Sequence, residues 1–323
     1  MKNKFFLTIL FFHLAILLFA RENSLCKITF EPSFGFMHGT VVENVWYVKE
    51  TKNNNTITYT PADRMSRLDW AMNISPCWGL NCCLNFPRNI VVDFDFNCLI
   101  TGDHGTMEDY DWLNPSTYAW RNDPPDELTN YSRHTNIIKT FTEAKFIAGY
   151  EFKLNTTPPC SITPLFGLFV QKCNFEGYGG YCIYKANNFE KKDFGKKVVI
   201  NYKQTYTAPY LELKAYIDFS DFDASFSLFT AYSKRMNCVD VHKLRNSYFF
   251  DRLRDVWFFG TNFKFMYKID SANKIGFKAS MQFSPDTYGF TYSNPVSKKP
   301  LADSLGGSSR MLWNYALVYS ITL

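Results

Sequence analysis

The sequence predicts an all-β protein, a ten-stranded antiparallel transmembrane β-barrel with extended extracellular loops. Three observations predict this fold class: long segments alternate large apolar with small or polar side chains, the N-terminus is typical of an exported chain, and aromatic residues make up 18% of the 323 residues. A period of two places one kind of side chain on each face of a strand. Membrane barrels direct the apolar face toward lipid and the polar face toward the lumen.

The N-terminal segment, residues 1–20, is predicted to be a cleaved signal peptide. Two lysines precede an apolar run that reaches Phe19, and Ala20 supplies a small residue at the cut. This order is typical of a secretory signal. No later stretch reaches about 18 apolar residues, the length that a transmembrane helix requires. Residues 21–323 are therefore expected to form a single barrel domain of about ten strands in the bacterial outer membrane.

Two hairpins carry the alternation most clearly. Residues 211–228 place leucine, isoleucine and phenylalanine on one face, with a two-residue turn at Ser220 and Asp221. The second hairpin covers residues 259–283 and places three lysines on its inward face: Lys264, Lys268 and Lys278.

The last segment, residues 311–323, has a large apolar residue at every odd position, and its even positions are mostly small or polar. A soluble β-sandwich would show the same alternation with its apolar face inward, and this is the alternative fold. The predicted export signal favours the barrel. Two polar segments, Lys49–Asp63 and Pro295–Ser309, are expected to be surface loops that overhang the barrel and select substrates.

Charge and cysteine usage limit the function further. A net charge of +5 with scattered basic residues gives no case for nucleic acid, which requires a basic patch with interleaved aromatic residues. The nine cysteines include no Cys-x-x-Cys pair, so no metal site is expected. Most of them are interpreted as small apolar residues of the barrel wall.

Two short segments carry the candidate chemistry. Residues i and i+2 share a face of a strand, so Asp109 lies beside Asp111 and Asp240 beside His242. If the two segments face each other, three carboxylates surround one imidazole. Asp240 would then orient His242, and the paired aspartates would raise the pKa of one carboxyl. A water between Asp109 and His242 would be deprotonated and attack a carbonyl carbon.

Each pair alone has a simpler interpretation. An Asp-x-Asp pair is commonly a solvated turn or a weak calcium site, and an Asp-x-His pair is commonly a surface pair. One histidine among carboxylates is a poor match to zinc.

The combination of segments resembles the omptin family of outer-membrane endopeptidases. The resemblance extends over Ser33–Asn294 and the last strand. It rests on these residues and segments: Gly35 to Gly39, Glu43, Val45, Leu68-Asp69-Trp70, Asp109-Tyr110-Asp111-Trp112, Asn130-Tyr131, Gly179-Gly180, Tyr202-Lys203-Gln204, Pro209-Tyr210 and Asp240-Val241-His242.

The resemblance implies an aspartic-type endopeptidase without a cofactor or a covalent intermediate. Its substrates would be proteins or peptides at the cell surface, cleaved beside basic residues in a groove that faces outside. By position, Asp109, Asp111, Asp240 and His242 match the family's catalytic residues, and Glu43 matches the acid that receives the basic P1 side chain.

Two departures from the family pattern leave an alternative open. Cys238 stands where the family has a second acid in its P1 pocket, which removes a charge from substrate binding. The family's lipopolysaccharide-binding pattern keeps Lys172 but has Thr205 at another basic position, so the need for lipopolysaccharide is left open. The alternative function is a catalytically weak or inactive barrel that acts as a surface adhesin. A small pore is disfavoured, because side chains fill a barrel of this size.

Overall fold

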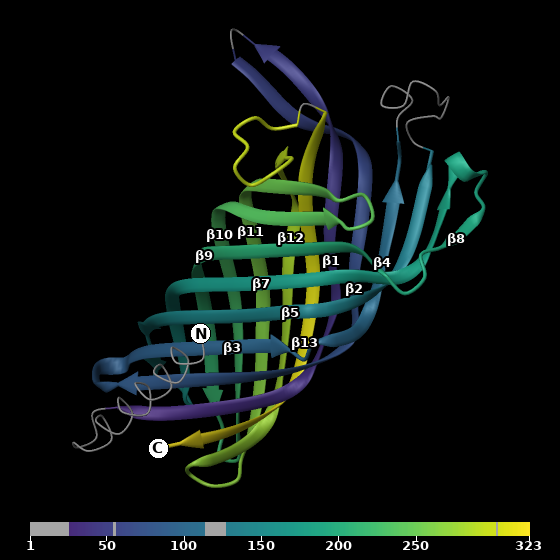
Figure 1. Ribbon diagram of the computed structural model, residues 1–323. Helices are drawn as coiled ribbons and strands as arrows, with labels where there is room; N and C mark the ends of the chain where they lie inside the picture. The colour runs from purple at the N-terminus through teal and green to yellow at the C-terminus, as the bar shows by residue number, and fades with distance from the viewer. Residues whose placement is uncertain (1–25, 54–55, 114–126, 302) are drawn as a thin grey trace.

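A closed antiparallel sheet forms the protein (Figure 1). The computed structural model describes residues 26–53, 56–113, 127–301 and 303–323, so the predicted signal peptide lies outside the described residues. The strands are β1 (Lys27–Asn53), β2 (Thr56–Phe86), β3 (Ile90–Leu99), β4 (Gly102–Asp111), β5 (Asn130–Tyr150), β6 (Phe152–Leu154), β7 (Cys160–Tyr184), β8 (Lys191–Asp193), β9 (Val198–Asp218), β10 (Phe222–His242), β11 (Ser247–Lys268), β12 (Asn273–Tyr292) and β13 (Ser304–Thr322). Two short 3₁₀ turns, η1 (Pro87–Asn89) and η2 (Lys185–Asn187), connect strands.

Ten positions make up the ring, which confirms the predicted strand number. β3 and β4 share one position, because β3 pairs with the lower half of β2 and β4 with its upper half. The short strands β6 and β8 each pair with β7. β1 pairs with β13 and closes the ring. No helix in the described ranges is long and apolar enough to cross a membrane.

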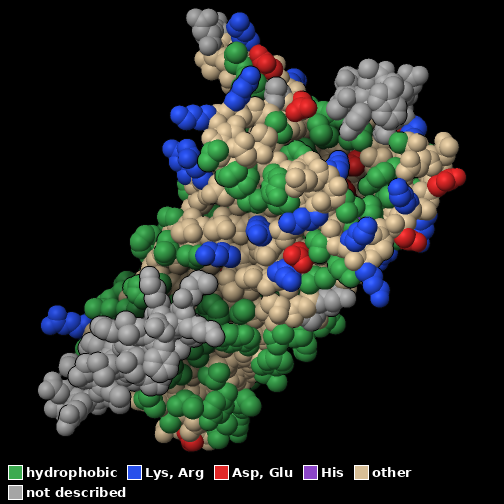
Figure 2. All heavy atoms as spheres, viewed as in Figure 1, with side chains coloured by type: hydrophobic (Ala, Val, Ile, Leu, Met, Phe, Trp, Pro, Cys, Tyr) green, Lys and Arg blue, Asp and Glu red, His purple; other side chains and the backbone are tan. Residues whose placement is uncertain are grey.

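The outer face of the barrel is apolar, as the alternation predicts. In β13, Leu317 is 68% exposed and its neighbour Val318 is 2% exposed. Figure 2 shows hydrophobic side chains covering the lower part of the molecule. The sandwich alternative is therefore wrong, because the large apolar side chains lie on the outside of a single closed sheet: Phe34, Phe36, Phe146, Phe166, Leu213, Leu228 and Phe263 are among them.

Ion pairs and lysine hydrogen bonds line the lower lumen. The lysines predicted to point inward do so: Lys264 donates to Glu31 at 2.8 Å, Lys278 donates to Asn97 at 3.2 Å, and Lys268 pairs with Asp218. Further pairs in the same region are Lys274 with Asp223 and Lys145 with Asp95. The polar face of the strands is thus neutralised inside the barrel.

An aromatic layer lies above these ion pairs. The Trp70 ring stacks between Tyr202 and Phe175, with ring centroids 5.7 and 5.8 Å away. All three side chains are fully buried. Leu68, two residues further up β2, lines the groove described below, so the aromatic layer separates that groove from the lower lumen.

The first predicted loop is largely strand, so that prediction is wrong, and the second is strand only at its C-terminal end. Most of Lys49–Asp63 belongs to β1 and β2, where Lys49 pairs with Thr60 and Thr51 with Thr58. The branched side chains of these threonines favour extended backbone. Residues 304–309 begin β13. Gly306 lies inside this strand because the Asp251 side chain occupies the space that a side chain at position 306 would need. The predicted turn at Ser220 and Asp221 is confirmed by the 2.9 Å hydrogen bond from Phe219 N to Phe222 O.

Candidate active site

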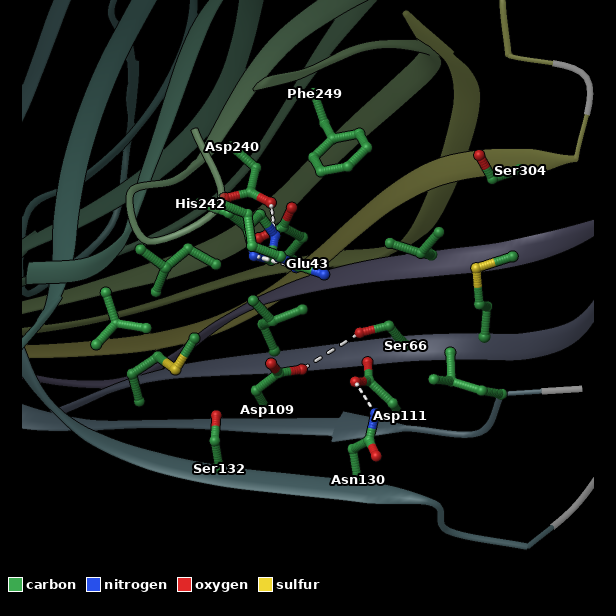
Figure 3. Close-up of a pocket in the computed structure, with 18 of the residues that line it drawn as sticks. Glu43, Ser66, Asp109, Asp111, Asn130, Ser132, Asp240, His242, Phe249 and Ser304 are labelled. Carbon is green, nitrogen blue, oxygen red and sulfur yellow. Dashed lines mark hydrogen bonds and ion pairs between the residues drawn. The ribbon is translucent and has the colours of Figure 1, made fainter. Parts of the chain in front are cut away.

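A groove of about 490 Å³ opens within the upper part of the ring. Side chains from ten strands line it: β1, β2, β4, β5, β7, β9, β10, β11, β12 and β13. The structure brings together all four predicted catalytic residues and Glu43 (Figure 3). The two predicted segments therefore face each other across the groove, although their catalytic roles stay predictions.

His242 is held by two neighbours. Its Nε2 lies 2.7 Å from Asp240 Oδ2, and the Arg245 guanidinium contacts its Nδ1. A guanidinium has only donors, so Nδ1 presents a lone pair and Nε2–H donates to Asp240. The ring therefore presents Nδ1 as its acceptor nitrogen, which Arg245 contacts in this structure and which a general base would use.

Asp109 and Asp111 lie opposite this pair, on β4. Ser66 Oγ donates to Asp109 Oδ1 at 3.3 Å, and Asn130 Nδ2 donates to Asp111 Oδ2 at 3.2 Å. Burial raises the pKa of Asp109, and the nearby charges of Asp111 and Asp240 raise it further. Burial also raises the pKa of Asp111, against the hydrogen bonds from Ser66 and Asn130. The pair therefore holds a proton to higher pH than an ordinary carboxyl.

A buried serine and histidine also line the groove, and the sequence reasoning missed them. Ser132 pairs with Asp109 across the β4–β5 ladder, and its hydroxyl donates to His134 Nε2 at 2.8 Å. His134 Nδ1 donates to the Gly179 carbonyl at 2.6 Å. Burial lowers the pKa of His134 and favours this neutral form. The Ser-x-His spacing on one strand face was the signal available in the sequence.

Glu43 and Asp251 form the acidic end of the groove. Glu43 is 2% exposed and Asp251 is 3% exposed. Within the described ranges, Glu43 Oε2 has no hydrogen-bond partner. Burial raises the pKa of Glu43 well above its ordinary value, and Asp240, Asp251 and Asp109 raise it further. Burial raises the pKa of Asp251 to about 7. Sequence reasoning missed Asp251, because its position opposite Cys238 depends on strand register.

Cys238 and Lys172 lie outside the groove lining. Cys238 is completely buried in β10 and pairs with Asp251 across the β10–β11 ladder. Lys172 is exposed on the outward face of β7, where it pairs with Thr205 of β9. Among the described side chains, no group of three His, Cys, Asp or Glu residues is placed to hold a metal ion.

The fold and this groove define a class: a ten-stranded barrel with an aspartate pair facing an aspartate–histidine pair. The chain belongs to the omptin family, whose model matches residues 25–300. The structure is similar to the crystal structure of the outer membrane protease OmpT from Escherichia coli, with a TM-score of 0.74 and 17% identity over 92% of this chain and 97% of that chain.

A second barrel, a FadL homologue from Pseudomonas aeruginosa, gives a TM-score of 0.29 with 8% identity over 93% of this chain and 90% of that one. A toluene transporter from Ralstonia pickettii, TbuX, gives a TM-score of 0.28 with 9% identity over 93% and 90%. A comparison with curated protein sequences gives no match.

Proposed function

We propose that this protein is an outer-membrane endopeptidase that hydrolyses peptide bonds beside basic residues with a water activated by Asp240 and His242. The observation that carries the proposal is the 2.7 Å contact between His242 Nε2 and Asp240 Oδ2 in a groove that also holds two buried aspartates. This contact fixes the ring so that Nδ1 keeps its lone pair on the opposite side.

The hydrolytic step follows from these positions. A water between His242 and Asp109 loses a proton to Nδ1 while its oxygen bonds to the carbonyl carbon. The imidazolium that forms is stabilised by Asp240. One carboxyl of the Asp109–Asp111 pair donates a proton toward the developing oxyanion, because burial raises the pKa of both groups and favours a protonated carboxyl in the pair. The proton on His242 finally moves to the leaving amine as the carbon–nitrogen bond breaks.

Arg245 must move before this step. Its guanidinium occupies the Nδ1 position that the water needs. The side chain lies on the turn after β10 and is exposed, so a substrate that enters the groove can displace it at small cost.

The outward apolar face supports a location in the outer membrane, with the groove on the outer side of the cell. Lys172 lies on the outward face of the same barrel, where an exposed ammonium can meet a lipid phosphate. We therefore retain lipopolysaccharide as the proposed lipid partner.

The test is cleavage of a quenched peptide containing Arg-Arg by the refolded protein, with and without lipopolysaccharide. We compare wild type with Asp109→Ala and His242→Ala and expect each variant to lose at least about a hundredfold in rate. Heat-modifiable migration on gels serves as the folding control. If folded wild type cleaves neither this peptide nor a mixed peptide library, the adhesin function becomes the better assignment, consistent with the charge lost at Cys238.

A further inference from the structure

The acidic end of the groove holds buried carboxylate oxygens that no cation of the described residues balances. Glu43 Oε2 and Asp240 Oδ1 are both buried, and neither has a hydrogen-bond partner in the part of the chain that the structure describes. A buried acceptor without a donor is unfavourable, because it has lost its hydrogen bonds to water. The only cationic side chain in the groove lining is Arg245 among the described residues, and it contacts His242. Nothing within those residues neutralises Glu43.

Asp251 lines the same end of the groove from β11. It lies on β11, directly opposite Cys238 on β10 and Thr291 on β12. Thr291 Oγ1 donates to Asp251 Oδ1 at 2.7 Å and fixes the carboxylate. Asp251 lines the groove, whereas Cys238 does not. The charge missing at position 238 is therefore present one strand away.

The glycine at position 306 lets Asp251 reach toward Glu43. A Cβ atom at Gly306 would lie 2.1 Å from Asp251 Cγ, so the carboxylate crosses β12 and rests on the backbone of β13. β13 is the strand that pairs with β1, which carries Glu43. The two acids thus approach one space from different strands. No side chain at position 306 separates them.

We propose that Asp251 is the second acid of the P1 pocket and that it selects arginine as the P1 residue together with Glu43. This inference rests on the proposed peptidase function. A guanidinium carries five donors in a rigid plane, so it can bond two carboxylates that stand on different strands. A lysine ammonium is a compact point charge and satisfies the two sites less completely. Glutamine and glutamate at P1 leave the acids unpaired or repelled.

The test uses matched peptides that differ only at P1, with arginine, lysine, glutamine or glutamate, and full-length refolded protein. Asp251→Asn keeps the shape of the side chain and its acceptor for Thr291. We expect it to lower kcat/KM for the arginine peptide by about ten- to a hundredfold and to leave the glutamine peptide within about twofold. Cys238→Ser is the matched control and should leave P1 preference unchanged. The double variant Cys238→Asp with Asp251→Ser should restore part of the arginine preference.

A binding measurement separates this inference from the peptidase proposal. Titration calorimetry with Nα-acetylarginine amide needs no hydrolysis, and Asp251→Asn should weaken its binding by about ten- to a hundredfold. Binding that depends on Asp251 without any cleavage would support the pocket and overturn the peptidase. Cleavage that loses rate equally for all P1 residues in Asp251→Asn, or loses none, would overturn the pocket alone. Cleavage and binding both absent in folded wild type would overturn both.

Discussion

The lower lumen and the upper groove both bury carboxylates, but they neutralise them differently. In the lumen, Glu31 has Lys264 at 2.8 Å and Asp223 has Lys274 at 2.5 Å. In the groove, Glu43 and Asp251 have no ion-pair partner among the described residues. We infer that the paired lumen charges stabilise the barrel, whereas the unpaired groove carboxylates are available to bind a ligand.

The contrast has a physical cost. A buried carboxylate without a partner disfavours its charged form, so the groove lowers the stability of the fold at neutral pH. Functional sites are where proteins accept such a cost, because the ligand supplies the missing partner. An acid-to-amide substitution should therefore lower the stability of the fold in the lumen and raise it in the groove.

The largest effect is expected for Asp240→Asn, which should lower kcat/KM by at least about a hundredfold. An amide can donate to Nε2 of His242, which turns the ring to the tautomer whose Nδ1 carries hydrogen and accepts no proton from water. The measurement is cleavage of the arginine peptide, with migration on gels before and after heating as the folding control. A loss smaller than about tenfold would show that Asp240 does not set the state of His242.

The next largest effect is a loss of stability, and it is expected for Glu31→Gln in the lumen. Glu31→Gln leaves the part-buried Lys264 ammonium without its carboxylate and should destabilise the barrel by up to about 3 kcal/mol. The measurement is the denaturant midpoint in detergent, followed by the shift of the gel band. Glu190→Gln, at an exposed position after η2, is the control and should change little. The comparison between the two regions fails if Glu31→Gln is as stable as this control.

Asp251→Asn should change stability in the opposite direction and in a pH-dependent way. The folded-state pKa of Asp251 is raised from its ordinary value of 3.8 to about 7, so the folded protein binds this proton more tightly than the unfolded chain does. Wild-type stability should therefore fall as pH rises between about 4 and about 7, and the penalty stays in full above that range. Asp251→Asn removes this penalty, so it should be the more stable protein near pH 8, with the two proteins converging near pH 4. Denaturant midpoints measured across this range would reject the assignment if the two curves stay parallel.

The smallest effect is expected for Arg245→Ala. Removing the exposed guanidinium frees Nδ1 of His242 and should lower KM for the arginine peptide by up to about fivefold. Lys243→Ala, on the same turn, removes an equal charge from a neighbouring position and is the matched control. Equal changes in both variants would mean that net charge, and not the contact with His242, sets the effect.

Sequence alone predicts the barrel and the pairing of residues along each strand of the groove, because both depend on which residues share a strand face. Asp109 with Asp111, and Asp240 with His242, are pairs at i and i+2, so the extended backbone places them together. The opposition of β4 and β10 across the ring was assumed in the sequence reasoning, and the structure places both on one groove.

What sequence reasoning missed depends on contacts between strands. The pairing of Cys238 with Asp251 follows from the register of β10 and β11, which no local pattern reveals. The segment around Gly306 looked like a loop because glycine usually weakens strands. The contact of Arg245 with His242 depends on how one turn folds back after β10.

The packing of the Asp251 carboxylate on the Gly306 backbone links two positions that lie 55 residues apart in the sequence. Any larger residue at 306 would meet the carboxylate before it met another strand, since the added atom lies 2.1 Å from Asp251 Cγ. The two positions are therefore expected to covary in evolution: relatives with an acid at the position of Asp251 should keep glycine at the position of Gly306, and relatives that lose the acid are free to gain a side chain there.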